Sequence, residues 1–207
     1  MAAKETIAFY FDPLCPWAWV TSRWATRLEV LGEVEIDWRV FSLGIAHLAE
    51  AEAIPDEPLG IGGPALQLLA QAKRLGGNPA IARLYTALGT AAHLRHQDLQ
   101  EASVLEQAWS EAGLDPADRE AAAADPTLWQ EVVSQHRGAV AACQAFGVPT
   151  LILDGGNGPG IFGPIITAVP DDDECRELLR DVVRMIRRGY FFEMKRDREG
   201  HPVRLEG

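Results

Sequence analysis

The stretch that decides the fold is residues 11–17, with the sequence FDPLCPW. Residues 6–11 before it, TIAFYF, are β-branched and aromatic, which is typical of a buried strand. From residue 17 onward, apolar side chains recur at spacings of three and four, which predicts one apolar face of a helix. Pro16 suits the first position of that helix, because an N–H there has no partner to lose. Cys15 is therefore expected where a strand ends and a helix begins.

The chain on both sides of this junction predicts a divided sheet. Residues 34–43, VEIDWRVFSL, alternate in polarity and indicate a second strand, so the opening is a strand–helix–strand unit, which favours parallel strands. Residues 44–63 are expected to be a loop. From 64 to 146 the chain is rich in Ala and Leu with helical spacing, which predicts four or five helices, with Asn78 and Asp125 as N-caps.

The strand pattern returns after residue 147. Residues 148–153, VPTLIL, are followed by a glycine-rich turn and a second apolar run at 161–166, which indicates a hairpin-like pair of strands. Asp171 is placed to cap a final helix, which Gly189 can end. The order is thus βαβ, a helical block, and ββα.

Composition narrows the class of protein. The 207 residues are 47% hydrophobic and 24% charged, which is typical of a globular chain that buries a core. The chain contains no apolar run of 18 residues and its N-terminus lacks a signal-peptide pattern, so we expect a cytoplasmic protein. The net charge of −11 disfavours nucleic acid and anionic membranes as partners. The oligomeric state is left open.

The strongest candidate for chemistry is Cys15. A thiolate at a helix start is stabilised by unpaired N–H groups, so we expect a thiol pKa below the value of about 8.5 of an unperturbed cysteine. The alternative is an inert thiol buried at the end of a strand. Three cysteines in a cytoplasmic chain argue against a disulfide framework. We expect no metal site, because the pair His93 and His96 lacks a third ligand.

A second candidate is the proline that precedes the third predicted strand. Pro149 removes a backbone donor at that point, and a cis peptide bond would explain its position. A cis bond would turn the backbone of Val148 outward, where it could pair with a bound chain or thiol conjugate. An ordinary trans proline in a turn is the alternative.

These two features, in this order, resemble the DsbA-like form of the thioredoxin fold. The resemblance implies an α/β protein with a thioredoxin-like sheet of the DsbA type and a large all-helical insertion. We expect residues 1–43 and 147–207 to form the thioredoxin-like domain and residues 44–146 to form the insertion.

The chain also resembles the actinobacterial mycothiol-dependent nitroreductases. The similar segments are residues 11–17 (FDPLCPW), 21–24 (TSRW), 84–89 (LYTALG), 162–164 (FGP) and 192–196 (FEMKR). The resemblance implies that Cys15 is the attacking thiol, that Pro149 is the cis proline, and that mycothiol or a similar thiol is the cosubstrate, with no tightly bound cofactor.

The chain departs from this pattern at one position. The family has Cys-Pro-Trp-Cys, whereas this chain has Cys15-Pro16-Trp17-Ala18, so the second, resolving thiol is absent. Cys143 and Cys175 lie on apolar helix faces and are expected to be core residues. A mixed disulfide on Cys15 must therefore be cleared by a thiol from outside the chain.

The remaining site predictions concern binding. Around Cys15 we expect the substrate to contact Pro16, Trp17, Trp19, His93, Val148, Pro149 and Phe162. The tryptophans and the helical block favour a small apolar or aromatic ligand. His93 is expected either to reach the cleft and direct a proton or to cap a helix.

Three functions remain open from the sequence. The first is a monothiol reductase that uses mycothiol to reduce an electrophilic small molecule. The second is a cis/trans isomerase in which Cys15 adds to a conjugated double bond and then leaves. The third is a binding protein that keeps the fold without catalysis.

Overall fold

The computed structural model describes residues 4–48 and 53–197 and contains a four-stranded sheet in the order β2-β1-β3-β4. Strands β1 (Glu5–Phe11) and β2 (Val34–Val40) are parallel, and the crossover between them is the predicted helix. Strand β1 lies inside the sheet, with Ile7 to Phe11 no more than 2% exposed, which explains its unbroken apolar sequence. Strands β3 (Thr150–Ile152) and β4 (Gly160–Phe162) form the predicted antiparallel pair.

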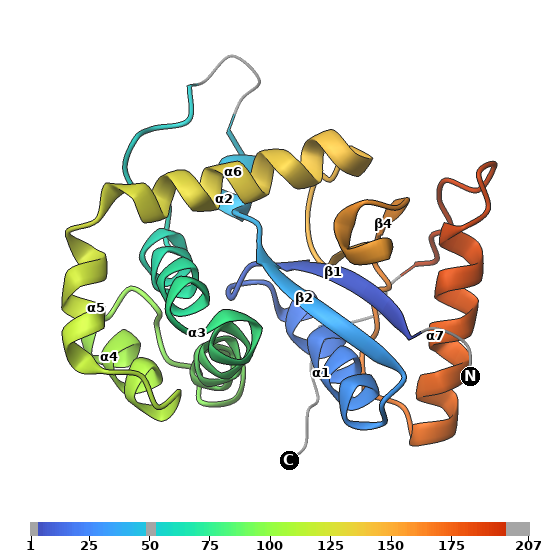
Figure 1. The fold of residues 1–207 in the computed structure, drawn as a ribbon, viewed down its shortest axis with the longest axis horizontal. Helices are drawn as coiled ribbons and strands as arrows, with labels where there is room; N and C mark the ends of the chain where they lie inside the picture. The colour runs from blue at the N-terminus through green and yellow to red at the C-terminus, as the bar shows by residue number, and fades with distance from the viewer. Residues whose placement is uncertain (1–3, 49–52, 198–207) are drawn as a thin grey trace.

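Two helices accompany the sheet on the side shown below and to the right in Figure 1. Helix α1 (Pro16–Val30) has Pro16 in its first turn and Leu31 as its C-cap, followed by Gly32 with φ +76°. Helix α7 (Asp172–Ile186) packs beside it, and the indole Nε1 of Trp24 donates to the carbonyl of Cys175 at 3.2 Å.

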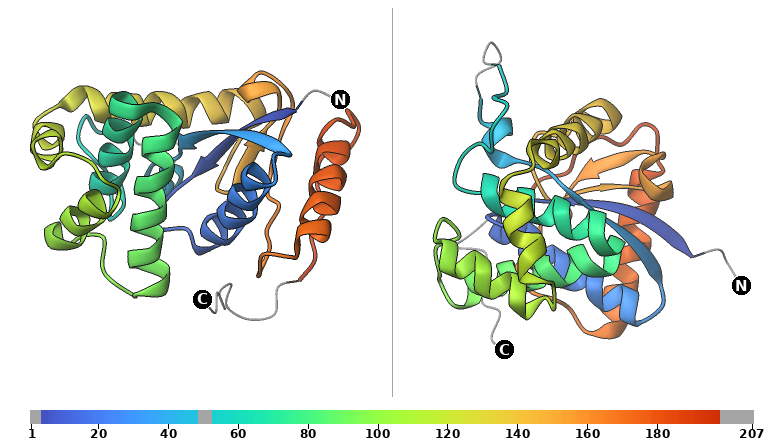
Figure 2. Two further views of the ribbon diagram at one scale, coloured as in Figure 1. Left: turned by 60° about the horizontal axis from the view of Figure 1, so that its bottom comes forward. Right: turned by 60° about the vertical axis from the view of Figure 1, so that its left-hand side comes forward.

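The elements between β2 and β3 are helical. They are α2 (Leu43–Ala46), α3 (Gly63–Gly89), the π-helical turn η1 (Thr90–Leu94), α4 (Ala102–Glu111), α5 (Pro116–Ala123) and α6 (Pro126–Cys143). Figures 1 and 2 show α3, α4 and α5 gathered beside the sheet and α6 running across it. Because α3 contacts both β2 and α6, one hydrophobic core joins the helices to the sheet. The predicted fold class is confirmed, whereas the division into domains at residues 43 and 147 stays a prediction.

Two local predictions were wrong. The second strand ends at Val40, and α2 occupies the start of the expected loop, because Ser42 caps it by accepting the N–H of Ile45. Asn78 caps no helix; it lies beside a bend in α3 at Gly76 and Gly77. Its side chain instead pairs with β2, donating to the carbonyl of Ile36 at 3.1 Å and accepting the N–H of Trp38 at 3.2 Å. Asp125 and Asp171 cap α6 and α7 as predicted.

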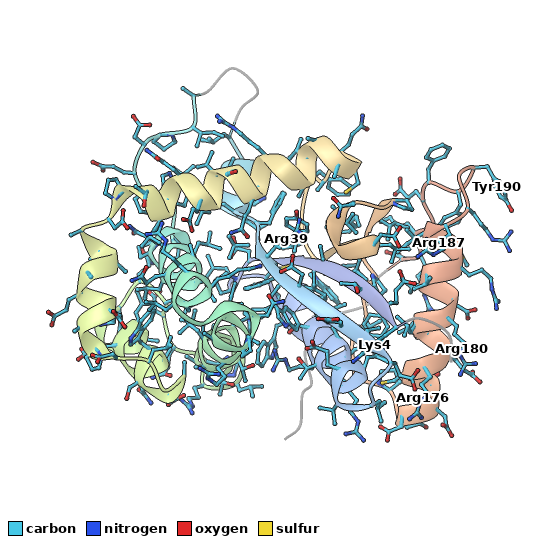
Figure 3. All side chains as sticks on the ribbon, viewed as in Figure 1. Lys4, Arg39, Arg176, Arg180, Arg187 and Tyr190 are labelled. Carbon is cyan, nitrogen blue, oxygen red and sulfur yellow. The ribbon has the colours of Figure 1, made fainter. Side chains whose placement is uncertain are left out.

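Basic residues line α7, as the labels of Arg176, Arg180 and Arg187 in Figure 3 show. Arg187 forms ion pairs with Glu5 and Asp154, and so ties the end of α7 to the sheet. Arg176 pairs with Glu33 in the turn before β2. Within residues 4–48 and 53–197, none of the helices combines the length and apolarity needed to cross a bilayer.

Candidate active site

The sulfur of Cys15 lies at the start of α1. Cys15 has an extended backbone (φ −83°, ψ 110°) and is the N-cap, and its Sγ accepts the N–H of Ala18 at 3.4 Å. The first turn of α1 contains no acidic residue, so no carboxylate within the helix competes for the partial positive charge of its N-terminus. Cys15 is only 7% exposed, so a reactant must approach it from one side.

The segment before β3 completes this arrangement. The thiol of Cys15 donates to the carbonyl of Val148 at 3.4 Å, across 133 positions of the chain. The Val148–Pro149 bond is cis, as the sequence predicted. Cys15 and the cis proline therefore lie side by side, in the arrangement that the resemblance implied.

Two hydrogen bonds anchor the β3–β4 hairpin at this point. The N–H of Gly163 donates to the carbonyl of Pro149 at 2.8 Å, and the hydroxyl of Thr21 on α1 donates to the carbonyl of Pro164 at 2.9 Å. The Gly163–Pro164 bond is also cis. The first hydrogen bond lies within the hairpin segment, and the second joins α1 to it. Together with the bond from Cys15 to Val148, the hydroxyl of Thr21 therefore connects the start of α1 to both ends of the hairpin.

His93 lies in the π-helical turn η1 and contacts residues 12–15, which lead into α1 and are called the thiol loop here. A carbonyl oxygen only accepts, so the ring Nε2–H donates to the carbonyl of Pro13, at 2.8 Å. Burial lowers the pKa of His93 below its usual range, although the bond to Pro13 opposes this, so the ring is neutral at pH 7. His93 lies beside the loop of Cys15, and its role with a proton stays a prediction.

Trp19 lies behind the site, not on its surface. It is 1% exposed, the guanidinium of Arg23 lies 4.0 Å from its ring centroid, and the ring of His93 stacks on it at 5.9 Å. A Cβ on Gly89 would lie 2.2 Å from its Cε3, so the indole fills the space beside α3. The core therefore encloses the Trp19 ring, and its contact with substrate stays a prediction.

Three of the other predicted contacts keep some accessible surface, whereas Val148 and Pro149 are buried. Pro16 and Trp17 in the first turn of α1 are half-buried, as is Phe162 on β4. The ring of Phe162 lies 4.7 Å from that of Phe146, which is 70% exposed. Sequence reasoning missed Phe146, although its place two residues before Val148 was a signal. Contact of these residues with a ligand stays a prediction.

Asp12 was also missed as a site residue. It is 1% exposed, and its carboxylate accepts the N–H of Leu14 at 2.9 Å and the N–H of Leu43 at 2.8 Å. Burial raises the pKa of Asp12 to about 6, against the effect of these two donors. An acidic residue directly after an apolar strand was the available signal.

The other two cysteines are placed away from this arrangement, and all three carry thiols. Cys175 is buried in the first turn of α7 and donates to the carbonyl of Pro170 at 3.4 Å, and Cys143 ends α6 and donates to Ala139. Burial raises the thiol pKa of both. Ala18 is fully buried at the family's second cysteine position. The described residues contain no cluster of three or more metal-ligating side chains.

Comparison with solved structures agrees with this geometry. A probable DsbA oxidoreductase from Streptomyces coelicolor is 20% identical and has a TM-score of 0.61, with 93% of this chain and 94% of that chain covered. A 2-hydroxychromene-2-carboxylate isomerase is 15% identical with a TM-score of 0.63, covering 88% of this chain and 96% of that one. At these identities the likeness shows the fold, which is DsbA-like.

Sequence comparison identifies the family. An uncharacterized protein of Mycobacterium tuberculosis, Rv2286c, is 30% identical over 200 residues, which are 97% of this chain and 85% of that protein. The model of the Rv2466c-like family, described as mycothiol-dependent nitroreductase Rv2466c, matches residues 14–196 and so includes Cys15, His93 and Pro149. The chain therefore belongs to the Rv2466c-like family of mycothiol-dependent nitroreductases, which are thiol-dependent oxidoreductases.

Proposed function

We propose that this protein is a cytoplasmic monothiol reductase that uses mycothiol to reduce an electrophilic small molecule of apolar or aromatic character. One arrangement carries the proposal: the Cys15 thiol at the start of α1, 3.4 Å from the carbonyl of Val148, with Ala18 where the family has its second cysteine. Membership in a mycothiol-dependent family supports the choice of cosubstrate. The half-buried Trp17 and the pair Phe146 and Phe162 support an apolar or aromatic substrate.

The chemistry balances with one protein thiol and two mycothiol molecules. In the first stage, the substrate takes up two electrons and two protons from the Cys15 thiol and one mycothiol thiol, whose sulfurs join in a mixed disulfide. In the second stage, the thiolate of another mycothiol attacks the mycothiol sulfur of that disulfide. The Cys15 thiolate leaves and regains a proton. Two mycothiols thus become one mycothiol disulfide for each two-electron reduction.

The residues around Cys15 suit both stages. The N–H of Ala18 donates to the sulfur and stabilises it as an attacking and as a leaving thiolate. When Cys15 loses its proton, the carbonyl of Val148 loses a donor and becomes available to an amide N–H of bound mycothiol. Neutral His93, which contacts the thiol loop at Pro13, is the candidate residue for transferring protons to the substrate.

The test is mass spectrometry of the intact protein after incubation with mycothiol disulfide, followed by thiol counting during turnover of a nitroaromatic probe. We expect one mycothiol adduct on the wild type and on Cys143→Ser, and none on Cys15→Ser. Two mycothiols should be consumed per two-electron reduction. An adduct that persists in Cys15→Ser would contradict the proposal.

A second candidate is the cis/trans isomerase. It is favoured by Ala18, because adding one thiol to a conjugated double bond and releasing it needs no resolving cysteine and no net electrons. Conversion of a polyene probe with no thiol consumed would support this function in place of the first. If Cys15→Ser bound every probe as the wild type does and neither protein converted any of them, the binding-protein hypothesis would replace both.

A further inference from the structure

The carboxyl group of Asp12 joins two separate segments close to Cys15. Its Oδ1 accepts the N–H of Leu14 at 2.9 Å, and its Oδ2 accepts the N–H of Leu43 at 2.8 Å. Leu14 belongs to the loop that presents the thiol, and Leu43 is the first residue of α2. One buried carboxylate therefore ties the thiol loop to the segment that leaves β2.

The loop is also closed by its own backbone and enclosed by a neighbour. The N–H of Cys15 donates to the carbonyl of Asp12 at 3.0 Å, so Asp12 contacts the loop through both main chain and side chain. Gly62 lies against it: a Cβ there would be 3.3 Å from Oδ1 of Asp12 and 3.1 Å from Cδ1 of Leu14. The surrounding chain leaves the carboxylate few ways to move.

We propose that Asp12 is a positioning residue of the Cys15 site. Its ionised carboxylate keeps residues 12–15 in the shape that places the thiol at the start of α1 and against the carbonyl of Val148. The inference deepens the proposed function, because it takes Cys15 as the reacting thiol.

The protonation state of Asp12 decides whether both hydrogen bonds can form. An ionised carboxylate accepts at both oxygens, whereas a protonated one turns one oxygen into a donor. Burial raises the pKa of Asp12 from about 3.8 to about 6, so it is ionised at pH 7 and protonated below pH 6. The other titratable groups that face this region are His47 at the end of α2, Tyr85 on α3, His93 in η1, whose ring donates to the carbonyl of Pro13, and Cys15 itself.

Burial in the folded state disfavours the ionised form of the Asp12 carboxyl group relative to its protonated form. A carboxyl pKa that is higher in the folded than in the unfolded state means that the folded state binds the proton more tightly. The contribution of Asp12 to stability is therefore largest below about pH 4 and is lost as the pH rises through about 6. A group that is unfavourable in its ionised form at neutral pH fits a role in shaping the thiol loop.

The experiment compares the wild type with Asp12→Asn, an isostere that cannot accept at both positions. The readout is the rate of Cys15 alkylation by iodoacetamide, divided by the thiolate fraction obtained from ultraviolet absorbance, between pH 5 and 8. Asp12→Asn loses a hydrogen bond to the charged carboxylate. We therefore expect its normalised rate of Cys15 alkylation at pH 7 to be at least about tenfold lower than that of the wild type. The wild-type rate should also fall below pH 6, and Asp12→Asn should lack that step.

Asp115→Asn is the matched control. The carboxylate of Asp115 likewise accepts the N–H two residues ahead, that of Ala117 at 2.9 Å, but at the exposed start of α5. This variant should keep the wild-type rate and pH profile. A normalised rate for Asp12→Asn within twofold of the wild type would overturn the proposal.

A second measurement needs no variant. In the wild type, the amide N–H resonances of Leu14 and Leu43 should titrate together with a midpoint near pH 6. Resonances that do not move over this range would overturn the proposal even if Asp12→Asn failed to fold. Neither measurement contains mycothiol, so failure of the proposed function would appear separately, as normal alkylation and titration without mycothiol turnover.

Discussion

Two helices of this protein begin close to a cysteine, and they use their N-termini differently. Helix α1 has the thiol of Cys15 as its cap and no acidic residue in its first turn. Helix α7 is capped by Asp171, whose carboxylate accepts the N–H groups of Asp173 and Glu174, and Cys175 comes one turn later. In α1 the positive helix end faces a sulfur, whereas in α7 it faces carboxylates.

The difference explains why only one of these thiols is a candidate nucleophile. At α7, burial raises the pKa of Cys175, and the charge of Asp172 adds to the effect. The Cys175 thiol is used as a donor to the carbonyl of Pro170. In α1 the sulfur itself occupies the cap, where a helix N-terminus stabilises a thiolate, whereas in α7 a carboxylate occupies that position.

The largest expected effect comes from replacing the cysteine near the start of each helix with serine. Cys15→Ser should lower mycothiol-dependent turnover by about 10³-fold or more, because the nucleophile is lost. Cys175→Ser should keep turnover within about twofold, since its sulfur lies away from the thiol loop. Steady-state rates with a nitroaromatic probe measure both. Equal losses in the two variants would show that the two helix starts are not functionally different.

A cysteine at position 18 should convert the site to a dithiol. Ala18→Cys places a thiol one turn after Cys15, whose Sγ already accepts the Ala18 N–H. Under oxidising conditions a disulfide should form and lower the yield of the Cys15–mycothiol adduct by about tenfold or more, because an intramolecular thiol outcompetes a solution thiol. Adduct yield with and without reductant, by mass spectrometry, is the measurement. An unchanged total yield of mycothiol adduct on the protein despite the bridge would mean that the adduct forms elsewhere and that Cys15 is not the working thiol.

The contact between Gly89 on α3 and the Trp19 ring should leave no room for an added methyl group. Gly89→Ala would bring a Cβ within 2.2 Å of the Trp19 ring and should cost about 1–3 kcal/mol of unfolding free energy. Gly138→Ala on α6 is the control, because its Cβ would meet nothing closer than the Tyr10 hydroxyl at 4.0 Å; it should gain about 0.5–1 kcal/mol. Urea unfolding separates the two. Equal stability of both variants would contradict the packing described for Trp19.

The pH dependence of alkylation sharpens the comparison further. Cys15 should reach half its maximal rate below about pH 8.5, the value of an unperturbed thiol, and Cys175 only above it. Peptide mapping after brief labelling at a series of pH values gives both profiles from one sample. A midpoint for Cys15 at or above that of Cys175 would remove the distinction between the helix starts.

The smallest effect concerns the cap of α7. Asp171→Ala removes the acceptor of two N–H groups and should cost about 1 kcal/mol of stability. Turnover per folded molecule should not change, because α7 carries no predicted site residue. Thermal unfolding and the same nitroaromatic assay measure these quantities, and a selective loss of turnover would place α7 in the site.

Local sequence was sufficient where neighbouring residues decide the structure. The apolar run of β1, Pro16 at the start of α1 and Asp125 and Asp171 as caps each depend on a few adjacent positions, and each prediction was confirmed. The cis bond before Pro149 was also predicted from its place at the start of a strand. Asn78 could not be predicted in this way, because its side-chain amide forms hydrogen bonds with the backbone of β2, which is distant in the sequence, and not with a helix end.

The sequence by itself determined the order of elements and identified Cys15 as the candidate nucleophile, because hydrophobic periodicity and the residues at a helix start are local features of the sequence. The family resemblance implied that the cis proline faces Cys15. Only the tertiary structure showed that the Cys15 thiol donates to the carbonyl of Val148, that His93 reaches Pro13, and that Asp12 ties Leu14 to Leu43. It also decided that Trp19 lies in the core. These contacts depend on how the helices between β2 and β3 pack on the sheet. Hydrogen bonds between distant segments form wherever packing buries both partners together, and no local pattern records that pairing.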